Sequence, residues 1–277
     1  MRIRYLGPPD FAPLSMLREY ATGGDAEVVL VHPRSGAQLR EVWPQLPSVQ
    51  WVHALSAGVE NLIFPELNVP LTNGRGIFAP ALAEWVLAAM LHFAKDIPRL
   101  MRQRRWEPFT VQRIEEQTVG IVGYGSIGRA VAALCAGMRI IPFSRHDGSL
   151  DEVFRDSDYV VVCAPLTEAT RGLIDARRMK REAVLINVGR GAVVDEAALV
   201  EALRSHHLQG AALDVFATEP LPPDHPLWAF DNVLISPHCA DHTPDSHELA
   251  MRCFLDNLAR FERGEPLLNV VDKEAGY

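Results

Sequence analysis

Short apolar runs recur along the chain and predict buried β-strands. Most of them are apolar at nearly every position, which is typical of parallel strands covered on both faces. The runs are Glu27–Val31, Trp51–Leu55, Thr118–Val122, Arg139–Phe143, Tyr159–Cys163, Val184–Asn187, Ala211–Val215 and Val233–Ile235. Segments with helical spacing of apolar residues, such as Asp195–Leu203, lie between several of them. This alternation predicts an α/β protein with a doubly wound parallel sheet.

Two longer helical patterns stand beside these runs. After Pro80, apolar residues recur at three- and four-residue spacing and predict one long helix. The residues that set this spacing are Leu82, Trp85, Val86, Met90, Phe93 and Ile97. A last helix is expected from about Ser246 to Phe261, and we expect it to return to the first domain. The length of 277 residues fits one large or two medium domains.

A glycine motif follows one of the predicted strands and opens a helix. Gly123, Gly125 and Gly128 form G-x-G-x-x-G in the context that a dinucleotide-binding, or Rossmann, domain requires. The first glycine permits a tight turn, the second lets the backbone approach a pyrophosphate, and the third packs the helix close to the strand. The amides of the new helix, at Ser126 and Ile127, then face the phosphates. The alternative is a glycine turn in another α/β fold.

The end of the next predicted strand bears on the choice of cofactor. Sites for NAD usually place an acidic residue there, where it binds the ribose 2′-hydroxyl. Ser144 occupies the expected position, Arg145 follows it, and no carboxylate appears before Asp147. A hydroxyl and a guanidinium suit a 2′-phosphate. We therefore expect NADP(H) to be favoured, with NAD(H) possible, unless Arg145 merely faces solvent.

Three later polar residues each come just after a predicted strand: Arg190, Glu219 and His238. Ligands of open α/β sheets bind outside the carboxyl ends of the strands, so these side chains are expected to converge there. A histidine can donate a proton to a reduced carbonyl oxygen, and a neighbouring carboxylate raises the histidine pKa. An arginine can bind and polarise a keto acid. Taken singly, each has a structural explanation, for example a lone buried histidine or a surface turn.

Composition and charge limit the classes of molecule that the protein is expected to bind. The net charge of -8 and the pI of about 5.7 argue against nucleic acid and anionic membranes. We expect no signal peptide and no membrane helix. The cysteines form no C-x-x-C pair, so reduced thiols in a cytoplasmic protein are expected. Pro237 and Pro244 bracket the loop that holds several histidines, which therefore share no helical face, and no metal is expected.

Several segments resemble the D-isomer-specific 2-hydroxyacid dehydrogenase family. They are the glycine motif, Pro165-Leu166-Thr167, Asn187-Val188-Gly189-Arg190-Gly191, Leu213-Asp214-Val215-Phe216 with Glu219-Pro220, and Ser236-Pro237-His238. Their order and spacing hold from about Gly58 to Ala240. The resemblance implies that Arg190, Glu219 and His238 are catalytic. It also implies that the loop containing Ala57 and Gly58 holds the substrate carboxylate through its amides.

The resemblance adds further cofactor contacts. Asp214 matches the residue near the nicotinamide carboxamide. Ala164 and Pro165, with Val188 and Gly189, match backbone that lines the cofactor. These roles come from the family alone.

The resemblance also implies which domain binds the substrate and which binds the dinucleotide. We expect a smaller, discontinuous α/β domain, residues 1–76 and 245–277, to bind the substrate, and residues 77–244 to bind the dinucleotide. A homodimer built on the cofactor domain is implied as well. The Ser144-Arg145 pair is similar to that of NADP(H)-using glyoxylate and hydroxypyruvate reductases, which suggests small 2-keto acids as substrates.

Two alternatives stay open. One is a related enzyme on the same scaffold, acting with NAD on another 2-hydroxy acid or on formate, although Glu219 argues against formate. The other is a cofactor-sensing interaction protein, like the corepressors of the family, without significant turnover. The side chains of Trp51, Leu55, Trp85 and Trp106 can line a pocket or fill a core, and we expect core positions for them.

Overall fold

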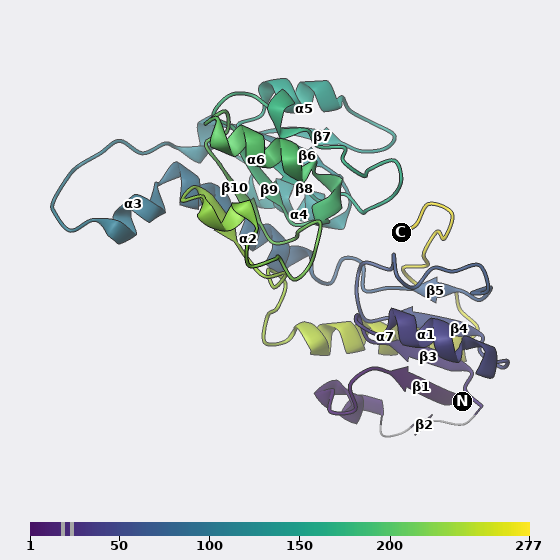
Figure 1. Ribbon diagram of the computed structural model, residues 1–277. Helices are drawn as coiled ribbons and strands as arrows, with labels where there is room; N and C mark the ends of the chain where they lie inside the picture. The colour runs from purple at the N-terminus through teal and green to yellow at the C-terminus, as the bar shows by residue number, and fades with distance from the viewer. Residues whose placement is uncertain (18–19, 23–24) are drawn as a thin grey trace. The chain divides into compact units, whose positions relative to one another are not determined.

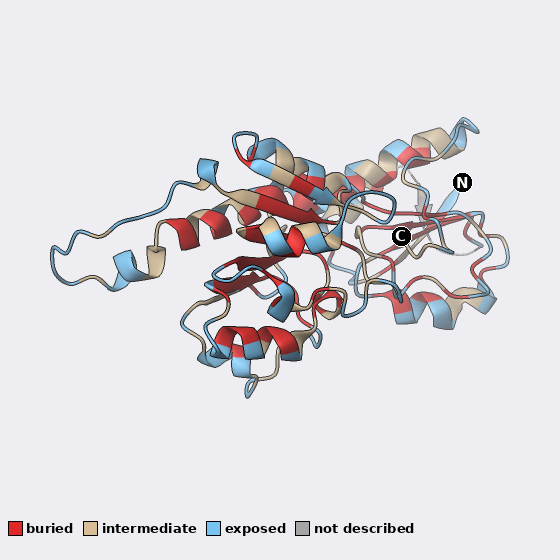
Figure 2. Cartoon of the chain, turned by 90° about the horizontal axis from the view of Figure 1, so that it is seen from above, coloured by how far each residue is buried: buried red, intermediate tan, exposed pale blue. Residues whose placement is uncertain are grey.

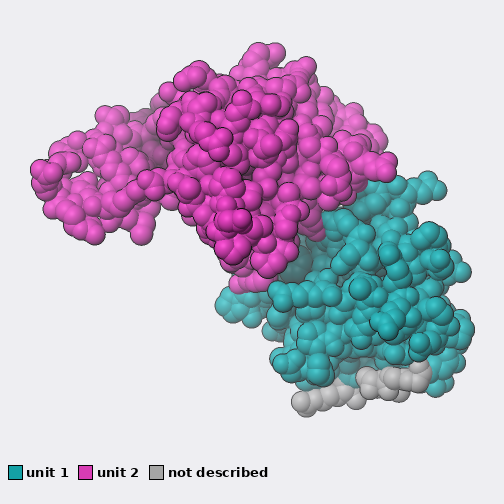
Figure 3. Space-filling model, in the orientation of Figure 1, with its two compact units in different colours: residues 1–78, 243–277 teal, residues 79–242 magenta. Residues whose placement is uncertain are grey.

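The structure is a computed structural model that describes residues 1–17, 20–22 and 25–277 (Figure 1). The chain divides into two compact units, coloured in Figure 3. Unit 1 comprises residues 1–78 and 243–277, and unit 2 comprises residues 79–242. Each is built around a parallel sheet whose strands are largely buried (Figure 2).

Unit 1 contains a five-stranded parallel sheet with the order β2-β1-β3-β4-β5. The strands are β1 (Arg2–Leu6), β2 (Ala21–Thr22), β3 (Val28–Val31), β4 (Trp51–Ala54) and β5 (Leu71–Thr72). Only β3 and β4, which are buried at every position, stood out as apolar runs. β1 was missed because Arg2 and Arg4 interrupt its apolar pattern. The helical segments are η1 (Ala12–Leu17), α1 (Gly36–Val42), η2 (Trp43–Gln45) and α7 (Ser246–Glu262).

Alternate residues of β3 separate two cores in unit 1, because successive side chains of a strand point to opposite faces. Val28 and Leu30 pack in a cluster with Phe254 and Leu258 of α7. Val29 and Val31 belong to the cluster on the other face. The helix from the end of the chain thus completes a core begun at its start. Phe254 is fully buried, so its replacement by alanine is expected to cost about 3–5 kcal/mol.

Unit 2 contains a six-stranded parallel sheet with the order β11-β10-β9-β8-β6-β7. The strands are β6 (Thr118–Val122), β7 (Arg139–Phe143), β8 (Tyr159–Val162), β9 (Val184–Asn187), β10 (Gly210–Leu213) and β11 (Val233–Ile235). The helical segments after β6 are α4 (Ser126–Leu134), α5 (Leu150–Asp156), η4 (Ala176–Arg178), η5 (Gly191–Val193), α6 (Glu196–Arg204) and η6 (Pro226–Ala229). The predicted doubly wound α/β fold is confirmed.

The helix expected after Pro80 ends sooner than its pattern suggests. α2 covers Ala79–Ala94, and α3 (Ile97–Arg102) is a separate helix. Asp96 interrupts the two with a φ of 47° and accepts a hydrogen bond from the amide of Arg99. The apolar spacing therefore runs across a break that a left-handed residue creates. η3 (Ile114–Glu116) leads into β6.

α3 and the segment that follows it, residues 97–113, stand away from the sheet of unit 2 and are here called the arm (Figure 1). The arm carries large apolar side chains in solvent: Leu100 is 48% exposed, Met101 74% and Trp106 93%. The expected core position of Trp106 is therefore wrong, whereas Trp51 and Leu55 are buried. Trp85 is half-buried.

Candidate active site

The glycine motif forms a tight turn between β6 and α4. Gly123 has a φ of +97°, and a Cβ there would lie 2.5 Å from the amide nitrogen of Ala164. A Cβ on Gly128 would lie 2.5 Å from the carbonyl oxygen of Gly123. A Cβ on Gly125, in contrast, would meet nothing within 4 Å. Two glycines therefore serve packing, and the middle one leaves open space against the backbone.

That open space fits a diphosphate. Gly125 is the N-cap residue of α4 and makes no side-chain cap hydrogen bond, so Ser126 and Ile127 begin the helix without a capping side chain. The first amides of a helix, together with its dipole, bind anions. The cradle thus has both the room and the donors that a dinucleotide needs.

The cradle lies where the order of the strands reverses. β7 follows β6 in the chain and pairs with one side of it, whereas β8 pairs with the other. This switch point is where open α/β sheets bind ligands. Ala164, after β8, touches Gly123 and also Gly189, whose Cβ would lie 2.7 Å from the Ala164 carbonyl oxygen. The carboxyl ends of three adjacent strands thus meet, with Pro165 and Val188 beside them.

The residues expected to select the cofactor form a tight turn at the end of β7. The amide of Ser144 donates to the carbonyl of Asp147 at 2.8 Å, and the amide of Asp147 donates back at 3.3 Å. The exposed Arg145 donates through Nε to Nε2 of His146 at 3.1 Å. The Asp147 carboxylate accepts from the amide of Gly148. The turn therefore presents a hydroxyl, a guanidinium and an imidazole, and His146 was not singled out by its sequence.

His238 and Glu219 form a direct pair. Nδ1 of His238 lies 2.8 Å from Oε2 of Glu219, and Oε1 of Glu219 accepts from the amide of Phe216 at 2.9 Å. The hydrogen bond that His238 donates to Glu219 raises the pKa of His238, although burial opposes this shift. Burial alone would raise the pKa of the Glu219 carboxyl, but the hydrogen bonds from His238 and the Phe216 amide outweigh it and leave that pKa lowered.

Arg190 lies near enough for its charge to act on both partners. It lowers the pKa of the Glu219 carboxyl and opposes the rise in the pKa of His238. Its Nη1 donates to the carbonyl of Gly189 at 2.7 Å. The buried Asn187 holds this loop, since it accepts from the amide of Gly189 and donates to the carbonyl of Arg190. The three residues expected to converge are thus brought together.

Asp214 shapes the loop that carries His238. Its buried Oδ1 accepts from the hydroxyl of Ser236 at 2.6 Å and from the amides of Cys239 and Ala240 at 2.9 and 3.1 Å. Its carbonyl accepts from the amide of His238 at 2.8 Å, and His238 has a φ of +52°. The sequence placed Asp214 after a strand but could not show which loop it would hold.

Ala57 and Gly58 belong to unit 1, whereas the other candidate residues belong to unit 2. They follow β4, and both carbonyl oxygens accept hydrogen bonds within the unit. Nδ2 of Asn73 donates to the carbonyl of Ala57 at 2.6 Å, and the hydroxyl of Ser56 donates to that of Gly58 at 2.7 Å. These contacts fix the loop.

In residues 1–17, 20–22 and 25–277, no three His, Cys, Asp or Glu side chains cluster in a way that could hold a metal ion. Within the same ranges, no helix has the length and apolar character needed to cross a membrane.

Residues 85–240 match the family model described as D-isomer specific 2-hydroxyacid dehydrogenase, NAD binding domain. A glyoxylate reductase of Aeropyrum pernix is 34% identical over 98% of this chain and 88% of its own length. The chain belongs to the D-isomer specific 2-hydroxyacid dehydrogenase family. The resemblance noted in the sequence is therefore confirmed.

Two solved structures match this dehydrogenase over its full length. A D-isomer specific 2-hydroxyacid dehydrogenase from Xanthobacter autotrophicus Py2, in complex with NADPH and MES, is 34% identical with a TM-score of 0.86. An NADPH-dependent glyoxylate/hydroxypyruvate reductase from Sinorhizobium meliloti, in complex with NADP and sulfate, is 28% identical with a TM-score of 0.87. Each match covers 100% of this chain and 99% of the other.

The activity class follows from this membership. The dehydrogenase is a nicotinamide-dependent oxidoreductase that interconverts 2-keto acids and 2-hydroxy acids, as predicted, and a pure sensor is not favoured. The expected cofactor class, NAD(P), is confirmed.

Proposed function

We propose that the protein reduces small 2-keto acids, such as glyoxylate and hydroxypyruvate, to D-2-hydroxy acids with NADPH. The observation that carries the chemistry is the 2.8 Å contact between His238 and Glu219 beside the charge of Arg190. The substrate class is supported by the relatives named glyoxylate reductase and glyoxylate/hydroxypyruvate reductase.

The proposed roles follow from the hydrogen-bond directions. A carboxylate can only accept, so Nδ1 of His238 carries the hydrogen that meets Glu219, and Nε2 is the ring atom left to serve the substrate. Protonated His238 donates its Nε2 hydrogen to the carbonyl oxygen as negative charge develops there. Arg190 binds the substrate and polarises its carbonyl. The amides of Ala57 and Gly58 hold the substrate carboxylate.

When bound, the nicotinamide dinucleotide supplies the hydride. We propose that Gly123, Gly125, Ser126, Ile127 and Gly128 bind its diphosphate through their backbone. Ser144 and Arg145 bind the 2′-phosphate, which makes NADP(H) the favoured form. The residues proposed to line the nicotinamide side are Ala164, Pro165, Val188, Gly189 and Asp214. Relatives in complex with NADPH and NADP support this preference.

We propose that unit 2 is the dinucleotide-binding domain and that unit 1 is the substrate domain. The family model for the NAD binding domain falls wholly within unit 2. The loop with Ala57 and Gly58, which is the part of unit 1 assigned to the substrate, lies at the carboxyl end of β4.

We further propose a homodimer that covers the arm. Large apolar side chains exposed to solvent mark interaction sites, and the arm carries Leu100, Met101 and Trp106. Light scattering after size-exclusion chromatography tests this proposal. A dimer that dissociates in Trp106→Ser supports it, and a wild-type monomer contradicts it.

We also propose a cytoplasmic location, since the four cysteines are free thiols.

One experiment tests the activity. Purified protein is mixed with NADPH or with NADH, and the loss of cofactor absorbance is followed on adding a panel of 2-keto acids. Turnover with NADPH and a small keto acid, abolished in His238→Ala, supports the proposal. Cofactor binding without turnover across the panel contradicts it and favours a sensor.

A further inference from the structure

A second pair of histidine and carboxylate joins the loop that carries Glu219 to α6. Nε2 of His225 is 3.1 Å from Oε1 of Glu196, the first residue of α6. Nδ1 of His225 accepts from the amide of Leu227 at 3.3 Å. Because an amide can only donate, the ring hydrogen of neutral His225 lies on Nε2 and points to Glu196. These side chains are 18% and 25% exposed, whereas those of His238 and Glu219 are 45% and 36% exposed. The second pair is thus more shielded than the first.

The other oxygen of Glu196 reaches the start of the same loop. Oε2 accepts from the amide of Ala217 at 3.3 Å. The preceding amide, of Phe216, donates to Oε1 of Glu219 at 2.9 Å. Two carboxylates therefore hold two consecutive amides. Gly191 packs against the same peptide so closely that a Cβ there would overlap the carbonyl carbon of Phe216. The position of this peptide is therefore fixed from several sides.

The far end of the loop, near His225, is also held by hydrogen bonds. The carbonyl of Pro222 accepts from the amide of His225 at 3.0 Å and from Nε1 of Trp228 at 2.9 Å. Glu196 thus holds both ends of residues 217–225 with one carboxylate, through the amide of Ala217 and the ring of His225. Glu219 lies between these two ends.

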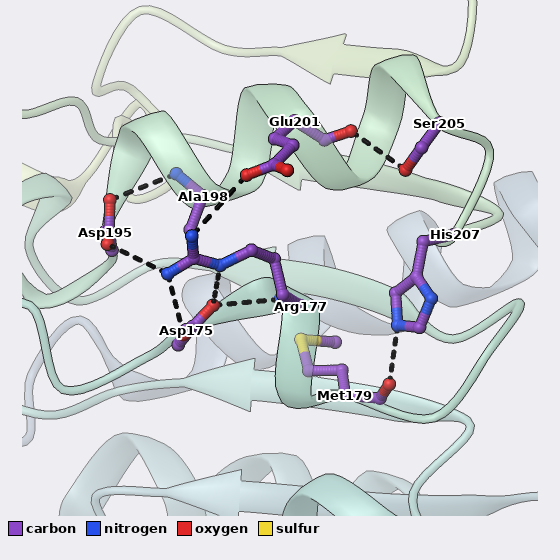
Figure 4. A network of polar contacts seen from close by, with 8 residues as sticks. All are labelled: Asp175, Arg177, Met179, Asp195, Ala198, Glu201, Ser205 and His207. Atoms are coloured by element: carbon purple, nitrogen blue, oxygen red, sulfur yellow. Dashed lines mark hydrogen bonds and ion pairs between the residues drawn. The ribbon is translucent and has the colours of Figure 1, made fainter.

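The helix that carries Glu196 is itself anchored (Figure 4). The carboxylate of Asp195 caps α6 by accepting from the amide of Ala198 at 3.0 Å. Arg177 lies 3.9 Å from Asp195 and 3.5 Å from Glu201, so it links the first two turns of α6 to η4. Glu196 therefore projects from a fixed support.

We propose that Glu196 and His225 are positioning residues that hold residues 217–225 so that Glu219 stays in hydrogen-bond contact with His238. The inference rests on the proposed roles of Glu219 and His238. Glu196 and His225 need not touch substrate or cofactor, because they act through the backbone of the loop. A carboxylate that loses its fixed distance to an imidazole also loses its hold on the charged form of that imidazole.

The titration midpoint of His238 measures this positioning without turnover. It can be followed by NMR in protein labelled with ¹⁵N-histidine, with the His238 signal assigned by its absence in His238→Ala. We expect the midpoint to fall in Glu196→Ala and to fall less in Glu196→Gln, which keeps one acceptor oxygen. His225→Gln, whose amide nitrogen can still donate to Glu196, should lie closer to wild type than His225→Leu. Glu152→Gln is the control, since it removes a carboxylate of α5 that pairs with Arg139 and takes no part in the contacts that hold α6 or the loop.

Turnover supplies the second readout. We expect kcat/KM of Glu196→Ala to drop about tenfold at pH 8 and less at pH 6, because a small misplacement of a catalytic group is costly. An unchanged His238 midpoint in Glu196→Ala, or an equal change in Glu152→Gln, overturns the inference. If Glu196→Ala does not fold, the titration midpoint of His238 in Glu196→Gln and in the two His225 variants tests the inference instead. A wild-type protein without turnover refutes the proposed function. The titration midpoints of His238 then still test whether Glu196 and His225 position Glu219.

Discussion

The carboxylate of Glu219 meets the imidazole of His238 at Nδ1, with 2.8 Å between Oε2 and the ring nitrogen. This contact fixes the tautomer of the ring and raises the pKa of His238. In the proposed reduction, the protonated ring acts as the acid. We therefore expect kcat/KM for reduction to be constant below the pKa of His238 and to fall as pH rises through it.

Removal of the Glu219 charge should shift the pH at which kcat/KM begins to fall. In Glu219→Gln the main cause of the raised pKa is absent, so the fall should begin at lower pH. We expect a loss of about 10²-fold in kcat/KM at neutral pH, in line with general acid catalysis. A pH series of initial rates checks both points. If kcat/KM began to fall at the same pH in Glu219→Gln as in the wild type, another group would supply the proton.

Gly125 provides a test of the cradle that separates binding from folding. A Cβ at Gly125 meets no atom of the protein within 4 Å, so Gly125→Ala should keep the wild-type Tm. The added methyl group would occupy the space that a diphosphate approaches, so the Kd for NADPH should rise by about tenfold or more. Gly137→Ala is the matched control, because a Cβ there also meets nothing within 4 Å. Cofactor fluorescence titration and a melting curve of each variant suffice, and equal affinities in both would contradict the assignment.

Arg145 provides a test of cofactor choice. We expect Arg145→Gln to raise the KM for NADPH by about 10- to 100-fold, which corresponds to the loss of one or two charge-assisted hydrogen bonds. The KM for NADH should hardly change, because its ribose carries no 2′-phosphate. Arg155→Gln, a change at another exposed arginine of unit 2 that pairs with Asp156, serves as the control. A parallel rise in both KM values would mean that Arg145 acts on the fold of the turn.

Local pattern predicted the sheet of unit 2 almost residue by residue, because its central strands, β6, β8, β9 and β10, are buried at nearly every position and leave a continuous apolar signature. Unit 1 was harder for a physical reason. β1 alternates charged and apolar residues, and β5 is only two residues long, so neither leaves such a signature. The break at Asp96 also escaped notice, since a left-handed residue changes the path of the chain without changing the apolar spacing.

The candidate site shows a similar limit. Strand ends and the chemistry of the side chains predicted that Arg190, Glu219 and His238 would converge, and they do. The supporting contacts were not predictable, because they depend on distances between loops. Asp214 binds amides of a loop more than 20 residues later, and Glu196 binds the amide of Ala217. Neither partner can be read from spacing along the chain.

His53 gives a prediction about stability in acid. Burial lowers its pKa to about 3, and its Nδ1 lies 2.7 Å from the hydroxyl of Thr72, while its Nε2 meets no partner in the described part of the chain. In the unfolded chain the pKa of a histidine is near 6.5. The unfolded state therefore binds more protons between these values, so the free energy of unfolding falls as pH drops from about 6.5 towards 3 and is unaffected above that window.

His53→Gln isolates this contribution, because glutamine is polar but does not titrate in this range. Relative to the variant, the wild type should lose up to about 1.4 kcal/mol of unfolding free energy per pH unit within the window. Urea unfolding at several pH values checks the difference in slope. Identical slopes for the two proteins would show that His53 takes up its proton in the folded state.

The discontinuity of unit 1 has a consequence for the order in which a newly made chain can fold. A ribosome releases residues 1–78 before α7, so the core that Ile3, Val28 and Trp51 share with Phe254 lacks its helix until α7 emerges. All of residues 79–242 leave the ribosome in between, as one uninterrupted stretch. Because domains fold as units during synthesis, we expect the glycine cradle of unit 2 to be complete while the amino-terminal strands still have apolar surface uncovered. We therefore expect the nascent protein to be more exposed to aggregation before α7 is released than after α7 has packed on the sheet of unit 1.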